Sequence, residues 1–165
     1  MQHKIYVKNN APERIPRIGA ILIRRVIKAA FEHEGVEPMC EVSVLITDDP
    51  GIRAVNLKFR GIDEPTDVLS FPLFKFKPGA FDASDGTPDI ATGLLPLGDI
   101  ALSAESVMRQ AEELGHTREH EAAYLVIHST LHLLGYDHTD EGADKAEMRA
   151  RERAILRICG FGGPE

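Results

Sequence analysis

Three histidines in the last third of the chain have the spacing of metal ligands. His128 and His132 are four residues apart, and His138 follows Gly135 in the stretch HSTLHLLGYDH. Side chains four apart on a helix lie on one face. Gly135 suits the end of that helix because glycine adopts a left-handed backbone at no steric cost, which lets the chain reverse and return His138. Three neutral imidazoles leave the fourth position of a tetrahedral zinc ion open, as in catalytic zinc sites. We therefore predict one Zn²⁺ at these histidines, although imidazole also suits copper, nickel and iron.

The residue after the first histidine limits the chemistry of this site. The H-x3-H-x5-H spacing is also that of the metzincin proteases, which place a general-base glutamate directly after the first histidine. Here that position is Ser129, and a serine hydroxyl cannot replace glutamate as a base at neutral pH. A zinc metallopeptidase is therefore an alternative that needs a base from elsewhere in the chain.

Composition and charge predict a cytoplasmic protein that does not bind membranes. No apolar stretch of the 165 residues reaches membrane-spanning length, the first residues do not resemble a signal peptide, and Cys40 and Cys159 are not in a CxxC pair. The net charge of −7 argues against indiscriminate nucleic-acid binding, and no DNA is expected as a partner. Basic residues nevertheless cluster, which leaves room for a local basic cleft: Arg14, Arg17, Arg24, Arg25, Lys28, Lys58, Arg60, Lys75 and Lys77.

Hydrophobic periodicity predicts four strands and five helices. The strands are expected at residues 3–8, 41–47, 67–71 and 97–102, and the helices at about 15–33, 48–59, 104–114, 118–134 and 140–158. The Pro-, Gly- and Asp-rich stretch at about 74–97 predicts a long loop, and loops of that length are usually functional or mobile. No linker divides the chain. We predict a single α+β domain over residues 1–165, with a small mixed four-stranded sheet packed against about five helices and a zincin-like metal site.

Several sequence blocks occur together in the order of one known family. Besides HSTLHLLGYDH, they are VLITDD at 44–49, Leu57 to Gly61, PTDVLSFP at 65–72, LGDI at 97–100, and Gly115-His116 followed by Glu119. From about residue 40 to 158 the chain resembles the YbeY endoribonucleases, the bacterial rRNA maturation factors. It departs from them at Ser129, where the family usually has glycine, and in the loop at 75–96, which looks longer than usual.

The resemblance implies a metal-dependent, single-strand-specific endoribonuclease that acts in maturation of the 16S rRNA 3′ end and in ribosome quality control. It implies contact with the small ribosomal subunit and with an Era-type GTPase, and zinc ligands His128, His132 and His138. It also identifies Arg60 as the arginine that the family is thought to need. A guanidinium suits the charge that develops on phosphoryl oxygens. The alternative is that Arg60 only complements the dipole of the helix that it ends.

The rest of the chemistry stays open at this point. A bound metal would lower the pKa of a water molecule or polarise a phosphoryl oxygen. The general base could be Asp67, Asp99, His116 or Asp137, and RNA could instead supply its own 2′-hydroxyl as the nucleophile. A second alternative to the nuclease is a ribosome-assembly binding factor whose metal only holds the fold, although structural zinc sites normally have no open position.

Overall fold

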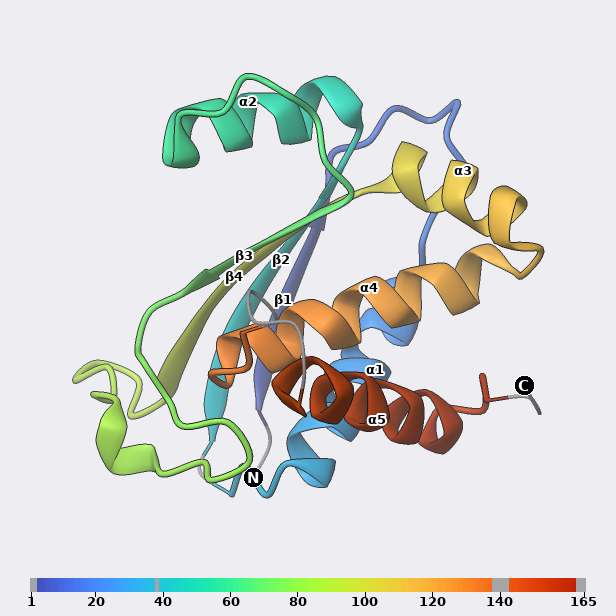
Figure 1. Ribbon diagram of the computed structural model, residues 1–165. Coiled ribbons are helices and arrows are strands. Elements are labelled where there is room, and N and C mark those ends of the chain that lie inside the picture. Colours follow the sequence, from blue (N-terminus) through green and yellow to red (C-terminus); the bar gives the residue numbers. More distant parts are fainter. Residues whose placement is uncertain (1–2, 38, 138–142, 163–165) are drawn as a thin grey trace.

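The computed structural model describes residues 3–37, 39–137 and 143–162. Within these ranges the chain forms four strands and five α-helices, in the order shown in Figure 1. The elements are β1 (Lys4–Asn9), α1 (Ala20–His33), β2 (Cys40–Thr47), α2 (Asp49–Arg60), β3 (Val68–Pro72), β4 (Leu95–Ser103), α3 (Ala104–Leu114), α4 (Arg118–Leu133) and α5 (Ala143–Ile158), with one 3-10 turn at Ala83–Asp85.

The four strands form one mixed sheet. Their order is β1-β2-β4-β3; β1, β2 and β4 run parallel, and β3 runs antiparallel to β4 at the edge. Alternation along β2 turns Cys40, Val42, Val44 and Ile46 into the core. The predicted α+β class with a small mixed sheet and about five helices is confirmed.

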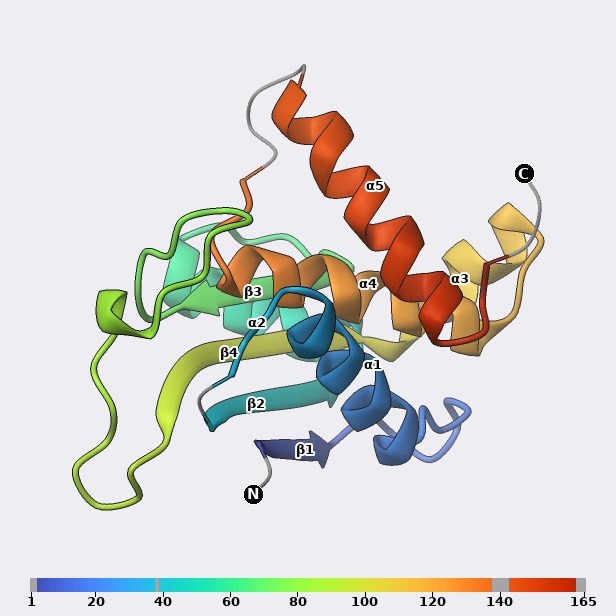
Figure 2. The ribbon, with the colours of Figure 1, turned by 90° about the horizontal axis from the view of Figure 1, so that it is seen from below.

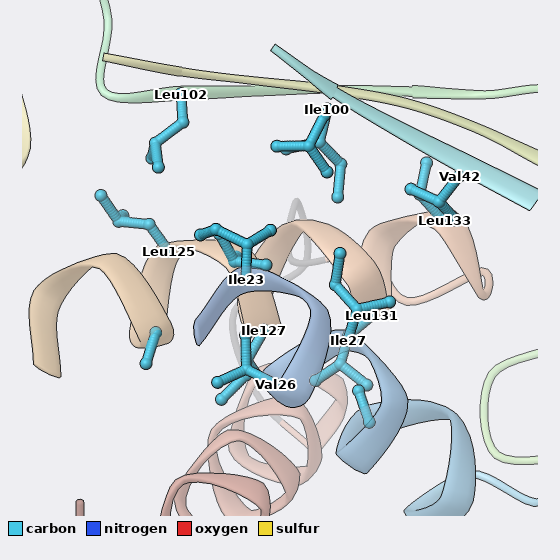
Figure 3. Packing of buried hydrophobic residues seen from close by; sticks show 14 of the residues in the cluster. Ile23, Val26, Ile27, Val42, Ile100, Leu102, Leu125, Ile127, Leu131 and Leu133 are labelled. Carbon is cyan, nitrogen blue, oxygen red and sulfur yellow. The ribbon is translucent and has the colours of Figure 1, made fainter. Parts of the chain in front are cut away.

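The helices cover the two faces of the sheet unequally. Helices α1 and α4 pack on one face and α5 packs on the outside of both, whereas α2 lies on the other face (Figures 1 and 2). Isoleucines and leucines from α1, α4 and the sheet interdigitate in the main core (Figure 3). Under α2 a small second cluster joins Ile52 to Leu69 and Ala101. Helix α4 therefore lies between the sheet and α5, and nearly all of its surface from Glu121 to Leu133 is buried.

Two elements begin more than one residue away from the predicted position. Helix α1 begins at Ala20, about five residues later than predicted, because Pro16 lacks a backbone N–H and disfavours a helical backbone at Ile15. Ile15 is nevertheless buried, which explains why it fitted the apolar pattern. Strand β4 begins at Leu95, so the last residues of the predicted loop belong to this strand. The start predicted for the last helix, at about residue 140, lies outside the described residues.

The start of α4 is fixed by a capping residue. The Thr117 side chain accepts a hydrogen bond from the backbone N–H of His120, so Thr117 is the N-cap of α4. None of the helices in the described ranges is long and apolar enough to cross a membrane.

Candidate active site

Two of the predicted ligands lie side by side at the end of α4. His128 and His132 are one helical turn apart, and their ring centroids are 4.5 Å apart with the planes at 80°. Their Nε2 atoms are 3.0 Å apart. The spacing in the sequence therefore brings two imidazole nitrogens to one point. The third predicted ligand, His138, lies outside the described residues.

Each of these rings is held through its other nitrogen. His128 Nδ1 lies 2.7 Å from Oε2 of Glu152 on α5. His132 Nδ1 lies 2.7 Å from the backbone carbonyl oxygen of Tyr136. A carboxylate and a carbonyl oxygen only accept hydrogen bonds, so in both rings Nδ1 is the donor. Neutral rings therefore keep a lone pair on Nε2, the atom that faces the other ring.

This arrangement fits a bound cation. Two lone pairs that face each other at 3.0 Å repel unless a proton or a metal ion lies between them. A tetrahedral zinc ion with bonds of about 2.0–2.1 Å requires ligand nitrogens about 3.3 Å apart, and the observed separation is close to that. Histidine ligands in metal sites usually donate their other N–H to a carboxylate or a carbonyl, as both do here. No group of three metal-ligating side chains lies within the described residues, so the complete ligand set stays a prediction.

A hydrogen-bonded network behind the histidines fixes the backbone after α4. The Tyr136 hydroxyl donates to Glu34 Oε1 at 2.6 Å, and Arg151 Nη1 of α5 lies 2.7 Å from Glu34 Oε2. Burial raises the pKa of Glu34, but hydrogen bonds from Tyr136, Arg151 and His33 together outweigh it and hold the pKa below its ordinary value. Arg151 and Glu152 are neighbours on α5, so this helix supports both histidines.

The histidines open into a cleft of about 840 Å³ between α4, β3 and the loop that follows β3. Arg60 lines the same cleft from the last turn of α2. Asp48 caps the start of α2 by accepting a hydrogen bond from the Gly51 N–H. At the other end of α2, Gly61 adopts a left-handed backbone with φ of 72°. Sequence signals at both ends of α2 therefore place the guanidinium of Arg60 at the cleft.

The loop after β3 forms a second wall of the cleft. Lys75 and Lys77 are exposed there, and with Arg60 they put three cations around the histidines. Gly135 has φ of 104°, and a Cβ at this position would lie 2.1 Å from the carbonyl oxygen of Phe76. Gly135 therefore has a second role besides ending α4. Because it has no side chain, the backbone of the loop at Phe76 can pack against it.

The structure separates the four candidate bases by position. Asp67 and Asp137 line the cleft. Asp67 accepts hydrogen bonds from the Val68 N–H at 2.7 Å and from the side-chain amide of Gln110 at 3.2 Å. His116 lies before α4 and its Nε2 is 2.9 Å from Oε1 of the buried Glu121. Asp99 lines a different hollow, on the α2 face of the sheet. His116 and Asp99 are therefore outside the cleft, which leaves Asp67 and Asp137.

Comparison with known proteins identifies the family of the chain. The family model described as Endoribonuclease YbeY matches residues 7–160. The chain belongs to the YbeY endoribonuclease family. It is 45% identical over 150 residues to the Endoribonuclease YbeY of Roseiflexus sp. (strain RS-1), which covers 90% of this chain and 88% of the relative. It is 46% identical over 140 residues to that of Caldanaerobacter subterraneus subsp. tengcongensis, with coverage of 85% and 87%.

A solved structure shares the YbeY fold described above. The solution structure of TM1509 from Thermotoga maritima is 28% identical, with a TM-score of 0.60, and the match covers 94% of this chain and 89% of that one. The YbeY assignment means that the chain is an endoribonuclease, which is a hydrolase that acts on RNA.

Ser129 and Met148 have structural roles in this YbeY chain. Ser129 is fully buried, and its hydroxyl has no hydrogen-bond partner within the described residues. Position 129 therefore faces the core and not the cleft. Met148 is likewise buried, at 1% exposure, in the main hydrophobic core.

Glu152 is the residue at this YbeY site that the sequence reasoning missed. A signal for it exists, since Met148, Glu152 and Ile155 share the core-facing side of α5 and all three are buried. A carboxylate in that row needs a partner, because an unpaired buried charge is costly. The sequence alone does not say that this partner is His128.

Proposed function

We propose that this protein is a metal-dependent endoribonuclease specific for single-stranded RNA. The observation that carries the proposal is the pair of histidine nitrogens 3.0 Å apart, each ring oriented by an acceptor, in a cleft with Arg60, Lys75 and Lys77. Cations around a metal-binding pair suit a phosphodiester, because phosphate oxygens carry the negative charge that they attract.

Zinc is the ion that we propose for the site, with His128 and His132 as ligands and His138, from the sequence, as the third. When bound there, zinc would act as a Lewis acid and lower the pKa of water. Glu152 and the Tyr136 carbonyl keep the hydrogen on Nδ1 of both rings, so that both Nε2 atoms are available as ligands.

Arg60 has the position needed to stabilise a phosphate. It is exposed on the cleft, and it forms no ion pair with another described residue. A guanidinium that is not engaged by a carboxylate can pair with two phosphoryl oxygens at once. We therefore propose that Arg60 binds the scissile phosphate. Interaction with the dipole of α2 is then not its only role.

Proton transfer is assigned to the cleft carboxylates. Asp67 and Asp137 line the cleft and can accept a proton from an attacking hydroxyl or water. If the RNA 2′-hydroxyl attacks, the product ends in a 2′,3′-cyclic phosphate; if water attacks, one product carries a 5′-phosphate. Analysis of the product ends distinguishes the two routes.

The biological role that we propose follows from the family resemblance. It is maturation of the 16S rRNA 3′ end and ribosome quality control in the cytoplasm, in contact with the small ribosomal subunit and an Era-type GTPase. The matched family and its relatives carry the endoribonuclease name, which supports the activity but not these particular partners.

The direct test compares cleavage of a single-stranded RNA with that of the same sequence annealed to its complement. Zinc-loaded protein should cut the single strand only, and His128→Ala and Arg60→Ala should each lose most of the rate. Lys58→Ala is the matched control for Arg60, because Lys58 shares the last turn of α2 but does not line the cleft. Equal cleavage of both substrates, or full activity in His128→Ala, would contradict the proposal.

A further inference from the structure

After Glu119, the side chains of α4 that are not buried all carry rings. From Glu121 to Leu133 every residue is buried except Tyr124, His128 and His132, and His120 is partly exposed one turn before Tyr124. A spacing of four residues places these side chains in one row along the helix. The ring centroids of Tyr124 and His128 are 6.1 Å apart. His116 extends the row, stacked on His120 at 4.1 Å and 16°.

Helix α5 carries a row of cations at the same spacing. Lys145, Arg149 and Arg153 are each four residues apart and line a shallow hollow of about 310 Å³. None of the three forms an ion pair with another described residue, whereas Arg151 on the neighbouring flank is engaged by Glu34 and Glu147. Three cations on one side of a helix, none paired with a carboxylate in the described residues, are notable in a chain with a net charge of −7.

The two rows belong to helices that pack against each other. Glu152 of α5 contacts His128, and Phe161, just beyond α5, lies 5.7 Å from the ring of His120. Arg149 is three residues before Glu152, so the two are neighbours on the surface of α5. Figure 2 shows α5 crossing α4, with its first turns standing away from the rest of the fold.

From this arrangement we infer that α4 and α5 form a binding track for single-stranded RNA that leads to the histidine pair. Bases stack on Tyr124, and phosphates bind Lys145, Arg149 and Arg153. Aromatic side chains beside a cationic row are the features that bind single strands without reading their sequence. A duplex keeps its bases stacked inside and cannot use the rings. The inference rests on the proposed function and deepens it, since it names residues besides the histidines and Arg60 that hold the substrate.

Binding is tested by fluorescence anisotropy with a labelled single-stranded RNA that gels show to stay intact. The double variant Arg149→Glu, Arg153→Glu should bind at least about tenfold more weakly near 50 mM salt. The slope of log affinity against log salt should become shallower by about 1.4, which corresponds to two lost phosphate contacts. Lys28→Glu is the control, because Lys28 is exposed on α1 and undergoes the same charge change. If Lys28→Glu weakens RNA binding equally, the loss of affinity reflects general repulsion between RNA and a more negative protein. That result would contradict the proposed binding track.

The ring row is tested at Tyr124. Tyr124→Leu should weaken binding about 5- to 150-fold, the range for one lost base stack, whereas Tyr124→Phe should bind like the wild type. In cleavage assays Tyr124→Leu and the double variant should raise KM more than they lower kcat, a difference that loss of folding would not produce.

These results separate the track from the proposed function. Wild-type protein that binds the single strand through these residues but does not cut it would refute the nuclease proposal and leave the track. If the wild type cuts RNA, but Tyr124→Leu and the double variant bind the single strand as tightly as the wild type, the track is refuted and the nuclease proposal is not. Equally tight binding of the duplex would also overturn it.

Discussion

Replacement of Glu152 by glutamine should weaken metal binding at the histidines without unfolding the protein. Glu152 Oε2 lies 2.7 Å from His128 Nδ1, and only 4% of the Glu152 side chain and 20% of the His128 side chain are exposed. Water therefore screens this interaction little. A glutamine amide keeps the size of the carboxylate but loses its charge, and its NH₂ can donate to Nδ1, which would move the ring hydrogen to Nε2 and block that atom as a ligand.

The size of this effect follows from the same contact. A hydrogen bond to a charged group contributes about 1.5–3 kcal/mol. Loss of an outer partner of a ligand typically lowers metal affinity by about 10- to 100-fold, and at 1.36 kcal/mol per tenfold this is about 1.4–2.7 kcal/mol. The two ranges overlap, so we expect the zinc dissociation constant of Glu152→Gln to rise by about 10- to 100-fold.

Competition with a chromophoric chelator measures that constant, and circular dichroism checks the fold. The matched control is Glu147→Gln, the same change on the same helix, at a side chain that is 53% exposed and paired with Arg151. Its zinc affinity should equal that of the wild type. If folded Glu152→Gln binds zinc as tightly as the wild type, Glu152 does not orient His128 and our reasoning about the tautomers is wrong.

Three further predictions concern the cleft and its support. Gly135→Ala should lower the free energy of unfolding by at least about 2 kcal/mol in denaturant titrations, because its Cβ would meet the Phe76 carbonyl. The control is Gly93→Ala, where φ is 73° but no atom lies near the new Cβ. An equal loss of stability in the control would show that the close contact is not the cause. The folded-state pKa of Glu34 is lowered, so its stabilising contribution is present above the ordinary value of 4.5 and lost as pH falls through the folded pKa. Glu34→Gln should therefore lower stability at neutral pH by about 1.5–3 kcal/mol and flatten the acid side of the stability profile; a profile parallel to that of the wild type would contradict this. Arg60→Ala should reduce kcat by about 10²- to 10³-fold with unchanged thermal unfolding, and an unchanged kcat would remove Arg60 from the chemistry.

Much of the fold was predictable because local signals agreed with tertiary packing. The alternation in β2 and the Asp48 and Thr117 caps each place an element correctly. The start of α1 was wrong because the buried Ile15 and Ile18 continue the apolar pattern outside the helix. Hydrophobicity reports burial, and a buried segment need not be helical.

The candidate site was predictable where it depends on spacing along one element. His128 and His132 converge because helical geometry alone brings them together. The partners of their Nδ1 atoms were not predictable, because Glu152 comes from another helix and the Tyr136 carbonyl from a turn. The choice among the four candidate bases also needed the fold, since only the positions of Asp67 and Asp137 on the cleft separate them from Asp99 and His116.

The central claim is that the histidine pair holds a metal ion with which the protein cuts single-stranded RNA. Its most direct test is the initial rate of cleavage as zinc is titrated into chelator-treated protein, for the wild type and for His132→Ala. We predict no cleavage before addition, a rate that saturates at one ion per chain in the wild type, and no recovery in His132→Ala. Full cleavage in the presence of chelator, or equal recovery in His132→Ala, would contradict the account.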